Sequence, residues 1–166
     1  IISSSNNFGP YQYTEKLIPL VISNIIEGKK VPVHGSGEHR RSWIHVNDFC
    51  SAIDLVLHKA PNYSIYNISG EEKTNLEIIE MISRHLKENS ETYKEHTKDR
   101  PGADIRYAPD SSKICAELGW KRAHSLEDSM GEVIAWYSNN QDWWRKIKSK
   151  KDFLDHYERQ ARAEYY

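Results

Sequence analysis

Apolar positions recur at helical spacing in three stretches of the chain. In residues 15–27 the aliphatic side chains follow a period of three to four residues, and Gly28 supplies a stop. The segment 74–77, Thr-Asn-Leu-Glu, fits a capping box ahead of a second apolar stretch. Ser125 stands in a similar position before a third stretch that reaches Trp136 and Tyr137. The pattern predicts a helix in each stretch.

Shorter signals predict further helices. Asn47 is expected to cap a helix that continues through Leu57, and Ser111 or Ser112 to cap a short helix closed by Gly119. Residues 146–166 form a charged tail with weak helical periodicity, expected to be helical or partly disordered. We therefore expect one domain over residues 1–145, followed by this tail.

Extended segments alternate with these helices. Residues 31–37 form a short β-type run that enters a glycine turn, and residues 42–46 alternate as a strand does. Together they predict a strand pair with a loop at its tip. Residues 63–68 are β-rich and end near Gly70. Because helices and strands do not alternate strictly, the sequence predicts a mixed α/β fold.

Composition excludes some partners. The 166 residues carry a formal net charge of -1 with 28% charged residues, so nothing draws the chain to nucleic acid. No apolar run approaches the roughly 20 residues that span a bilayer, and we expect no membrane partner and a cytoplasmic protein. Cys50 and Cys115 lie in helical stretches and are expected to be buried, reduced thiols, with a disulfide between them not favoured.

The segment 99–107 is the richest in candidate chemistry. It places two arginines, two aspartates and a tyrosine around the Pro101-Gly102 turn. A guanidinium can bind phosphate through two parallel hydrogen bonds, so this segment could clamp a diphosphate. Alternatively, Asp99 pairs with Arg100, or Asp104 with Arg106, and the pairs only hold a surface loop.

A second basic site is Arg40-Arg41, which follows a glycine turn and precedes a predicted strand. This position suits an anion-binding cleft, although a solvated arginine pair is an equal alternative. Asn6, Asn7 and Lys16 add amide and ammonium groups that suit sugar and phosphate oxygens.

Other chemistries lack their motifs. The histidines are scattered without the spacing of metal ligands, so we expect no metal site. No G-x-S-x-G elbow and no G-x-G-x-x-G phosphate loop occur. Trp136, Tyr137, Trp143 and Trp144 are assigned to core packing.

Taken in order, several runs resemble the extended short-chain dehydrogenase/reductase family and, within it, the nucleotide-sugar 4,6-dehydratases. The runs are Asn6-Asn7-Phe8-Gly9-Pro10-Tyr11-Gln12, Glu15-Lys16-Leu17-Ile18-Pro19, Val31-Pro32-Val33-His34-Gly35-Ser36-Gly37, Arg41-Ser42-Trp43, Tyr66-Asn67-Ile68, Asp99-Arg100-Pro101-Gly102, Arg106-Tyr107, Leu118-Gly119-Trp120 and Trp136-Tyr137. Family members with other activities share some of these runs, and the Glu-Lys-Leu-Ile-Pro and Asp-Arg-Pro-Gly runs favour the dehydratases.

The resemblance implies a role for each matching residue. Asn7 is expected on the nicotinamide side of an NAD cofactor. The other implied residues bind the nucleotide-sugar substrate: Asn6 at the diphosphate or sugar, Lys16 and Leu17 along the site, Pro32, Val33 and His34 beside the base, Arg41 and Arg100 at phosphate or ribose oxygens, and Asn67, Asp99, Pro101 and Gly102 in the wall.

By the same resemblance, the chain is the substrate-binding half of an NAD-dependent enzyme that converts dTDP-glucose, or a related nucleotide glucose, to the 4-keto-6-deoxy sugar nucleotide. The amino-terminal Rossmann half, with its glycine-rich loop and its Tyr-x-x-x-Lys pair, is expected to precede this segment. No catalytic residue is therefore assigned, the chain alone is expected to be inactive, and the full-length protein is expected to be a homodimer.

Two alternatives remain: a UDP-sugar epimerase or decarboxylase of the same family, or a non-catalytic nucleotide-sugar-binding module. The chain also departs from the family pattern. Ser42 stands where aspartate is common, Asn47 where glutamate is common, and Phe49 and Ala103 where histidine is common. These positions leave the identity of the nucleotide and the sugar open.

Overall fold

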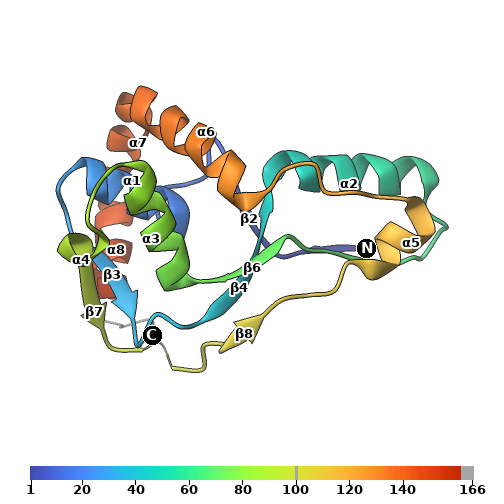
Figure 1. Cartoon of the computed structure of the whole chain (residues 1–166), viewed down its shortest axis with the longest axis horizontal. Helices are drawn as coiled ribbons and strands as arrows, with labels where there is room; N and C mark the ends of the chain where they lie inside the picture. The colour runs from blue at the N-terminus through green and yellow to red at the C-terminus, as the bar shows by residue number, and fades with distance from the viewer. Residues whose placement is uncertain (100, 162–166) are drawn as a thin grey trace.

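The computed structural model describes residues 1–99 and 101–161 and shows an elongated molecule of mixed helices and strands (Figure 1). In chain order the elements are β1 (Ile2–Ser4), β2 (Asn6–Phe8), α1 (Leu17–Ile26), β3 (Val31–His34), β4 (Arg40–His45), α2 (Val46–Lys59), β5 (Tyr66–Ile68), β6 (Glu71–Thr74), α3 (Asn75–His85), α4 (Ser90–Tyr93), β7 (Lys94–Thr97), β8 (Arg106–Tyr107), α5 (Ser112–Leu118), α6 (Leu126–Asn139), α7 (Gln141–Lys148) and α8 (Lys151–Ala161). The predicted mixed α/β fold is confirmed.

Strand β4 is the centre of the largest sheet. It pairs in parallel with β2 and β8 and antiparallel with β6, while β1–β5 and β3–β7 form two separate parallel pairs. The predicted pairing of residues 31–37 with 42–46 is therefore wrong. The chain turns away after β3 at Gly35, whose φ is 58°, and the Gly35 N–H extends the β3–β7 ladder by donating to the Thr97 carbonyl at 3.1 Å.

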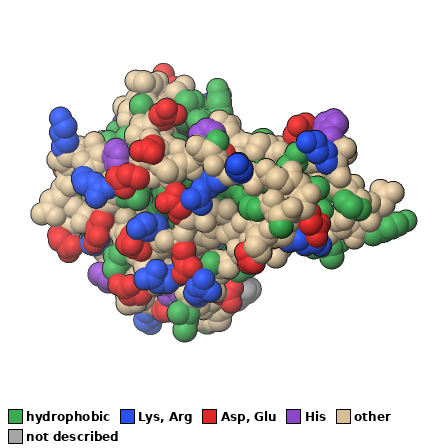
Figure 2. Space-filling model, turned by 45° about the vertical axis from the view of Figure 1, so that its right-hand side comes forward, with side chains coloured by type: hydrophobic (Ala, Val, Ile, Leu, Met, Phe, Trp, Pro, Cys, Tyr) green, Lys and Arg blue, Asp and Glu red, His purple; other side chains and the backbone are tan. Residues whose placement is uncertain are grey.

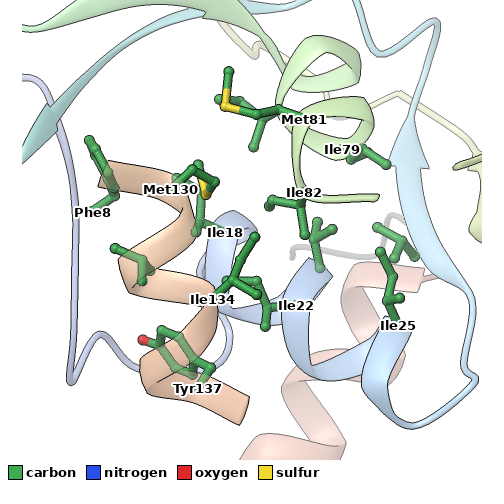
Figure 3. Packing of buried hydrophobic residues seen from close by; sticks show 14 of the residues in the cluster. Phe8, Ile18, Ile22, Ile25, Ile79, Met81, Ile82, Met130, Ile134 and Tyr137 are labelled. Carbon is green, nitrogen blue, oxygen red and sulfur yellow. The ribbon is translucent and has the colours of Figure 1, made fainter. Parts of the chain in front are cut away.

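The main hydrophobic core forms where α1, α3 and α6 pack together (Figure 3). Its fully buried side chains include Ile22 of α1, Ile82 of α3, and Met130 and Tyr137 of α6. The apolar faces of these three helices provide the packing that their periodicity predicts.

A second, smaller core lies among α2, α5, β1 and β5, at the opposite end of the molecule from α1 and α3 (Figure 1). Several large apolar side chains from this end are exposed, among them Ile1, Leu57, Tyr63 and Ile65. Figure 2 shows apolar side chains at the narrow end and interspersed charges of both signs over the broad end. No helix in the described ranges is long and apolar enough to cross a membrane.

Most helix ends follow the sequence signals. Thr74 and Glu77 form the predicted capping box, Ser125 caps α6 by accepting from the Asp128 N–H, and Gly119 ends α5 in the left-handed conformation. Asn47 is not the cap of α2. The helix begins directly after β4, so His45 holds the cap position and its Nδ1 accepts from the Asn47 N–H at 3.3 Å.

The two cysteines are free thiols, but both are exposed, so the expectation of burial is wrong. Helix α2 turns Asp48 and Ala52 inward, and α5 turns Ile114 inward. Each cysteine lies outside the buried stripe of its helix, because only a few positions of these helices reach the core.

The carboxy-terminal helices pack on α1. Helix α7 includes residue 145, where the domain was expected to end. The Lys148 ammonium at its end is buried against Ser23, Asn24 and Glu27, with Nζ–O distances of 3.1, 2.7 and 2.8 Å. Burial lowers the pKa of Lys148, while its bond to Glu27 acts in the opposite direction. The described part of the expected tail is thus helical, and the boundary expected at residue 145 stays a prediction.

Candidate functional site

A cavity of about 210 Å³ opens between the start of α1 and the strands β2, β3 and β4. Its lining includes six residues that the sequence assigns to a substrate site: Asn6, Lys16, Leu17, Pro32, His34 and Arg41. These residues come from four separate elements or their edges, so the fold and not the local sequence brings them together.

Strand register explains the convergence. The parallel pairing of β2 with β4 places Asn6 opposite Trp43. On β3 the alternation of a strand turns Pro32 and His34 toward the cavity, while Val33 faces the main core and is buried. Lys16 holds the cap position of α1 in an extended conformation and so lies at the rim.

The wall of this cavity carries charges of both signs. The Lys16 ammonium lies 2.7 Å from Oε1 of Glu15, and the other carboxylate oxygen of Glu15 lies 3.7 Å from Nε2 of His156. The Arg41 guanidinium donates to the Arg40 carbonyl at 2.7 Å. Lys16 and Arg41 therefore place two cations around a space with room for anionic groups.

A second cavity of about 370 Å³ shares Asn6, Lys16, Leu17 and Trp43 with the first and adds Asn7 and Gln12. Asn7 is held by two bonds from its Nδ2, to Ser4 Oγ at 2.8 Å and to the Ser5 carbonyl at 3.3 Å. The two cavities therefore adjoin, and together they are called the groove below.

Three lining atoms of the second cavity are buried and have no hydrogen-bond partner within the described part of the chain: Asn7 Oδ1, Gln12 Oε1 and Trp43 Nε1. Buried polar atoms are nearly always satisfied in folded proteins, so these two acceptors and one donor are candidates to bond a polar group placed beside them. A carboxamide or a sugar hydroxyl would fit them. The donor set is therefore compatible with the expected position of Asn7 beside nicotinamide.

The loop after β7 lies against the β3 end of the groove. A Cβ on Gly35 would lie 2.8 Å from the carboxyl carbon of Asp99, and an Asp99 oxygen lies 3.5 Å from His39 Nε2. Pro101 and Gly102 are exposed, and Arg100 lies outside the described residues. Arg106 makes a two-pronged pair with Glu72, with N–O distances of 2.9 and 2.7 Å.

Not every expected residue lines the two cavities. Val33 is part of the main core, and Asn67 is exposed on β5, opposite Ser3 of β1. Pro101, Gly102 and Asp99 likewise lie outside the lining of these two cavities. Ligand contacts of these residues stay predictions.

Sequence reasoning missed four lining residues of the first cavity: Glu15, Leu20, Trp43 and Asn75. Glu15 and Trp43 lie inside the quoted family runs, close to residues that were assigned to the site, so the motifs could have identified them. For Leu20 the apolar helical pattern indicated only a position in the hydrophobic core. Asn75 reaches the cavity because β6 pairs with β4, and no local pattern reports such a pairing.

Among the described residues no group of three or more histidine, cysteine, aspartate or glutamate side chains is arranged to hold a metal ion.

Comparison with known proteins places the chain in a family. The family model described as GDP-mannose 4,6 dehydratase matches residues 1–133. The chain belongs to the GDP-mannose 4,6-dehydratase family. The resemblance found in the ordered motifs is confirmed.

Within this family the chain is similar to dTDP-glucose 4,6-dehydratases. It is 44% identical over 146 residues to the enzyme of Streptomyces niveus, covering 87% of this chain and 43% of that protein. The Bacillus anthracis enzyme, solved in complex with NAD, has 44% identity and a TM-score of 0.84, covering 89% of this chain and 47% of that chain. The Streptomyces venezuelae enzyme, solved with NAD and TYD bound, has 37% identity and a TM-score of 0.86. This match covers 89% of this chain and 46% of that chain.

The chain therefore spans less than half the length of the curated relatives it matches. The match falls on the carboxy-terminal part of the dehydratase structures.

Proposed function

We propose that this chain is the nucleotide-sugar-binding part of an NAD-dependent nucleotide-sugar 4,6-dehydratase acting on dTDP-glucose or a related nucleotide glucose. The observation that carries the proposal is the convergence of Asn6, Lys16, Leu17, Pro32, His34 and Arg41 on one groove. The relatives named dTDP-glucose 4,6-dehydratase support the choice of nucleotide.

In the proposed reaction the nucleotide glucose loses one water and becomes the 4-keto-6-deoxy sugar nucleotide; NAD, when bound, would supply the hydride acceptor and donor and would not be consumed. The residues of this chain bind and orient the substrate. Lys16 and Arg41 would hold the diphosphate, and Asn6 and Asn7 would hold polar groups of the sugar and the nicotinamide. Such positioning lowers the barrier by fixing the sugar before reaction.

We assign no acid, base or nucleophile to the described residues. The proposal therefore includes that the 166-residue chain by itself gives no dehydratase turnover, because hydride transfer needs a bound NAD and a base. The full-length protein is proposed to act as a homodimer.

Isothermal titration with dTDP, dTDP-glucose and UDP-glucose tests the binding proposal. We expect both thymidine nucleotides to bind more tightly than UDP-glucose. Lys16→Ala should weaken dTDP binding about tenfold, since a charge-assisted hydrogen bond to phosphate contributes roughly 1.5 kcal/mol or more. Lys59→Ala, which removes an exposed lysine at the end of α2, is the matched control and should leave the affinity unchanged.

No heat from any of the three nucleotides would overturn the proposal. Tighter binding of UDP-glucose than of dTDP-glucose would reassign the chain to the UDP-sugar enzymes of the family. An equal effect of Lys16→Ala and Lys59→Ala would show that the groove is not the diphosphate site.

A further inference from the structure

Helix α8 reaches the wall of the substrate groove from outside, and it lies beyond residues 1–133, which the family model matches. It runs beside α1, the helix whose first turn borders the groove (Figure 1). Two contacts join α8 to residues that line the first cavity. The third buried cluster packs Phe153 against Leu20 and Ile147, and His156 faces Glu15.

The contact between His156 and Glu15 bears on the charge available to a ligand. Glu15 has two partners: its Oε1 lies 2.7 Å from the Lys16 ammonium, and its Oε2 lies 3.7 Å from His156 Nε2. A lysine that is tied to a carboxylate attracts a phosphate less strongly, because the negative charge offsets its own. A diphosphate that binds Lys16 therefore competes with the Glu15 carboxylate for the same ammonium.

We propose that His156 is a positioning residue that holds the Glu15 carboxylate and so makes Lys16 available to the diphosphate of the nucleotide sugar. This inference rests on the proposed function and extends it to a residue outside the groove. When its imidazole is protonated, His156 gives Glu15 a cationic partner that stays in place after Lys16 turns to the ligand.

Helix α8 is anchored on both sides of His156, and this anchoring keeps the histidine beside Glu15. Asn24 of α1 donates to the Tyr157 hydroxyl at 3.1 Å, one residue beyond His156, and the Tyr157 hydroxyl also donates to the Lys30 carbonyl at 3.3 Å. The Phe153–Leu20 packing lies one turn before His156. The His156 side chain is 42% exposed and that of Glu15 is 26% exposed, so the pair can change partners without opening the core.

The test is a double-mutant cycle on dTDP binding, measured by titration calorimetry with all variants at the same pH and ionic strength. His156→Gln should weaken dTDP binding about 1.5- to 5-fold, the range expected for an exposed ion pair. Glu15→Gln should tighten dTDP binding, and His156→Gln should have no effect in the Glu15→Gln background. Binding of thymidine, which lacks phosphate, should not respond to His156→Gln.

Two further variants separate positioning from packing. His156→Lys keeps a positive charge and should restore wild-type affinity for dTDP. His58→Gln removes another exposed histidine, which pairs with Asp54 on α2 at 3.3 Å, and should change nothing. Thermal unfolding of each variant checks that α8 remains folded.

The inference is overturned if His156→Gln binds dTDP as tightly as the wild type, or loses the same affinity with and without Glu15. Equal losses for dTDP and thymidine would also overturn it, because they would indicate a structural role. If the wild type binds no dTDP at all, the proposed function fails and this inference fails with it. If the wild type binds dTDP and His156→Gln gives one of the contradicting results, only this inference fails.

Discussion

Gly70 lies directly against the backbone of β4. Its N–H donates to Ser42 Oγ at 2.9 Å, and the same hydroxyl is 2.6 Å from Ser69 Oγ. Ser42, one of the departures from the family pattern, is buried and serves here to tie the turn before β6 to the strand that carries Trp43. The serine at this departure from the family pattern thus has a structural role in the described chain.

A side chain at position 70 has no space. A Cβ there would lie 1.7 Å from the carbonyl oxygen of Trp43, and that backbone atom cannot move without shifting β4. We expect Gly70→Ala to lower the free energy of unfolding by about 3 kcal/mol or more, as overpacking against rigid structure does. Gly119→Ala is the control, because Gly119 has a φ of 69° but open space around it.

The control should lose only about 1 to 2 kcal/mol, the cost of the left-handed conformation for a residue with a Cβ. Urea unfolding of both variants measures the difference. A loss at Gly70 no larger than the loss at Gly119 would contradict the close approach to β4.

At the scale of elements, the start of α2 is held by three ionisable side chains. The buried Asp48 carboxylate accepts from the backbone N–H groups of Ala123 and His124 at 3.0 Å each and lies 2.8 Å from the His124 ring nitrogen Nδ1. The His124 ring stacks on His45, with 4.5 Å between centroids. This cluster joins β4, α2 and the segment before α6.

The pKa shifts in this cluster predict that acid destabilises the folded chain. Burial, together with the neighbouring His124, lowers the pKa of His45 below its ordinary 6.5. Burial alone would raise the pKa of Asp48, but the hydrogen bonds from His124 and Ala123 outweigh burial and hold that pKa below its ordinary 3.8. In both cases the unfolded chain takes up its proton at a higher pH than the folded chain does.

We therefore expect the free energy of unfolding to fall as the pH drops through 6.5, the ordinary pKa of His45, with a further loss below 3.8 from Asp48. Protonated His45 also cannot accept the Asn47 N–H that caps α2. His45→Asn keeps an acceptor that does not titrate, so it should reduce the slope between about pH 7 and 5. Denaturant unfolding at several pH values measures this slope.

His58→Asn, on the exposed end of α2, should retain the wild-type slope. If His45→Asn and the wild type lose stability equally over that range, His45 is not the group responsible.

At the scale of the whole molecule, the two hydrophobic cores differ in size. Among the described residues the core of α1, α3 and α6 is the larger, whereas the second core buries Ile44, Ala52, Tyr66, Ile68, Ile114 and Trp120 beside the two-stranded β1–β5 pair. Parallel pairs are normally covered and extended by further strands, and a two-stranded pair is marginal by itself.

We expect hydrogen exchange to divide the molecule along this line. Amides of the β1–β5 pair, such as those of Ser5 and Tyr66, which donate to Ile68 and Ile1, should exchange faster than amides of Ile22 and Ile82 in the main core. Exchange followed by mass spectrometry or NMR measures the difference. Equal protection of the two groups would mean that the molecule opens as one cooperative unit.

The sequence by itself determined the longer helices α1, α2, α3 and α6, the short helix α5, most of their ends and the family. The Thr74–Glu77 box, the Ser125 cap and the Gly119 stop act within a few residues, and helical periodicity involves only neighbours along one chain segment. Six residues that line the first cavity were also predictable, because short ordered motifs carry them.

Only the tertiary structure decided which distant segments meet. It paired β3 with β7, gave the cap of α2 to His45, left Cys50 exposed, turned Val33 into the core and set His156 against Glu15. Each outcome depends on contacts between residues far apart in the chain. Local pattern cannot report them, because strand partners and buried faces are chosen by the packing energy of the whole fold.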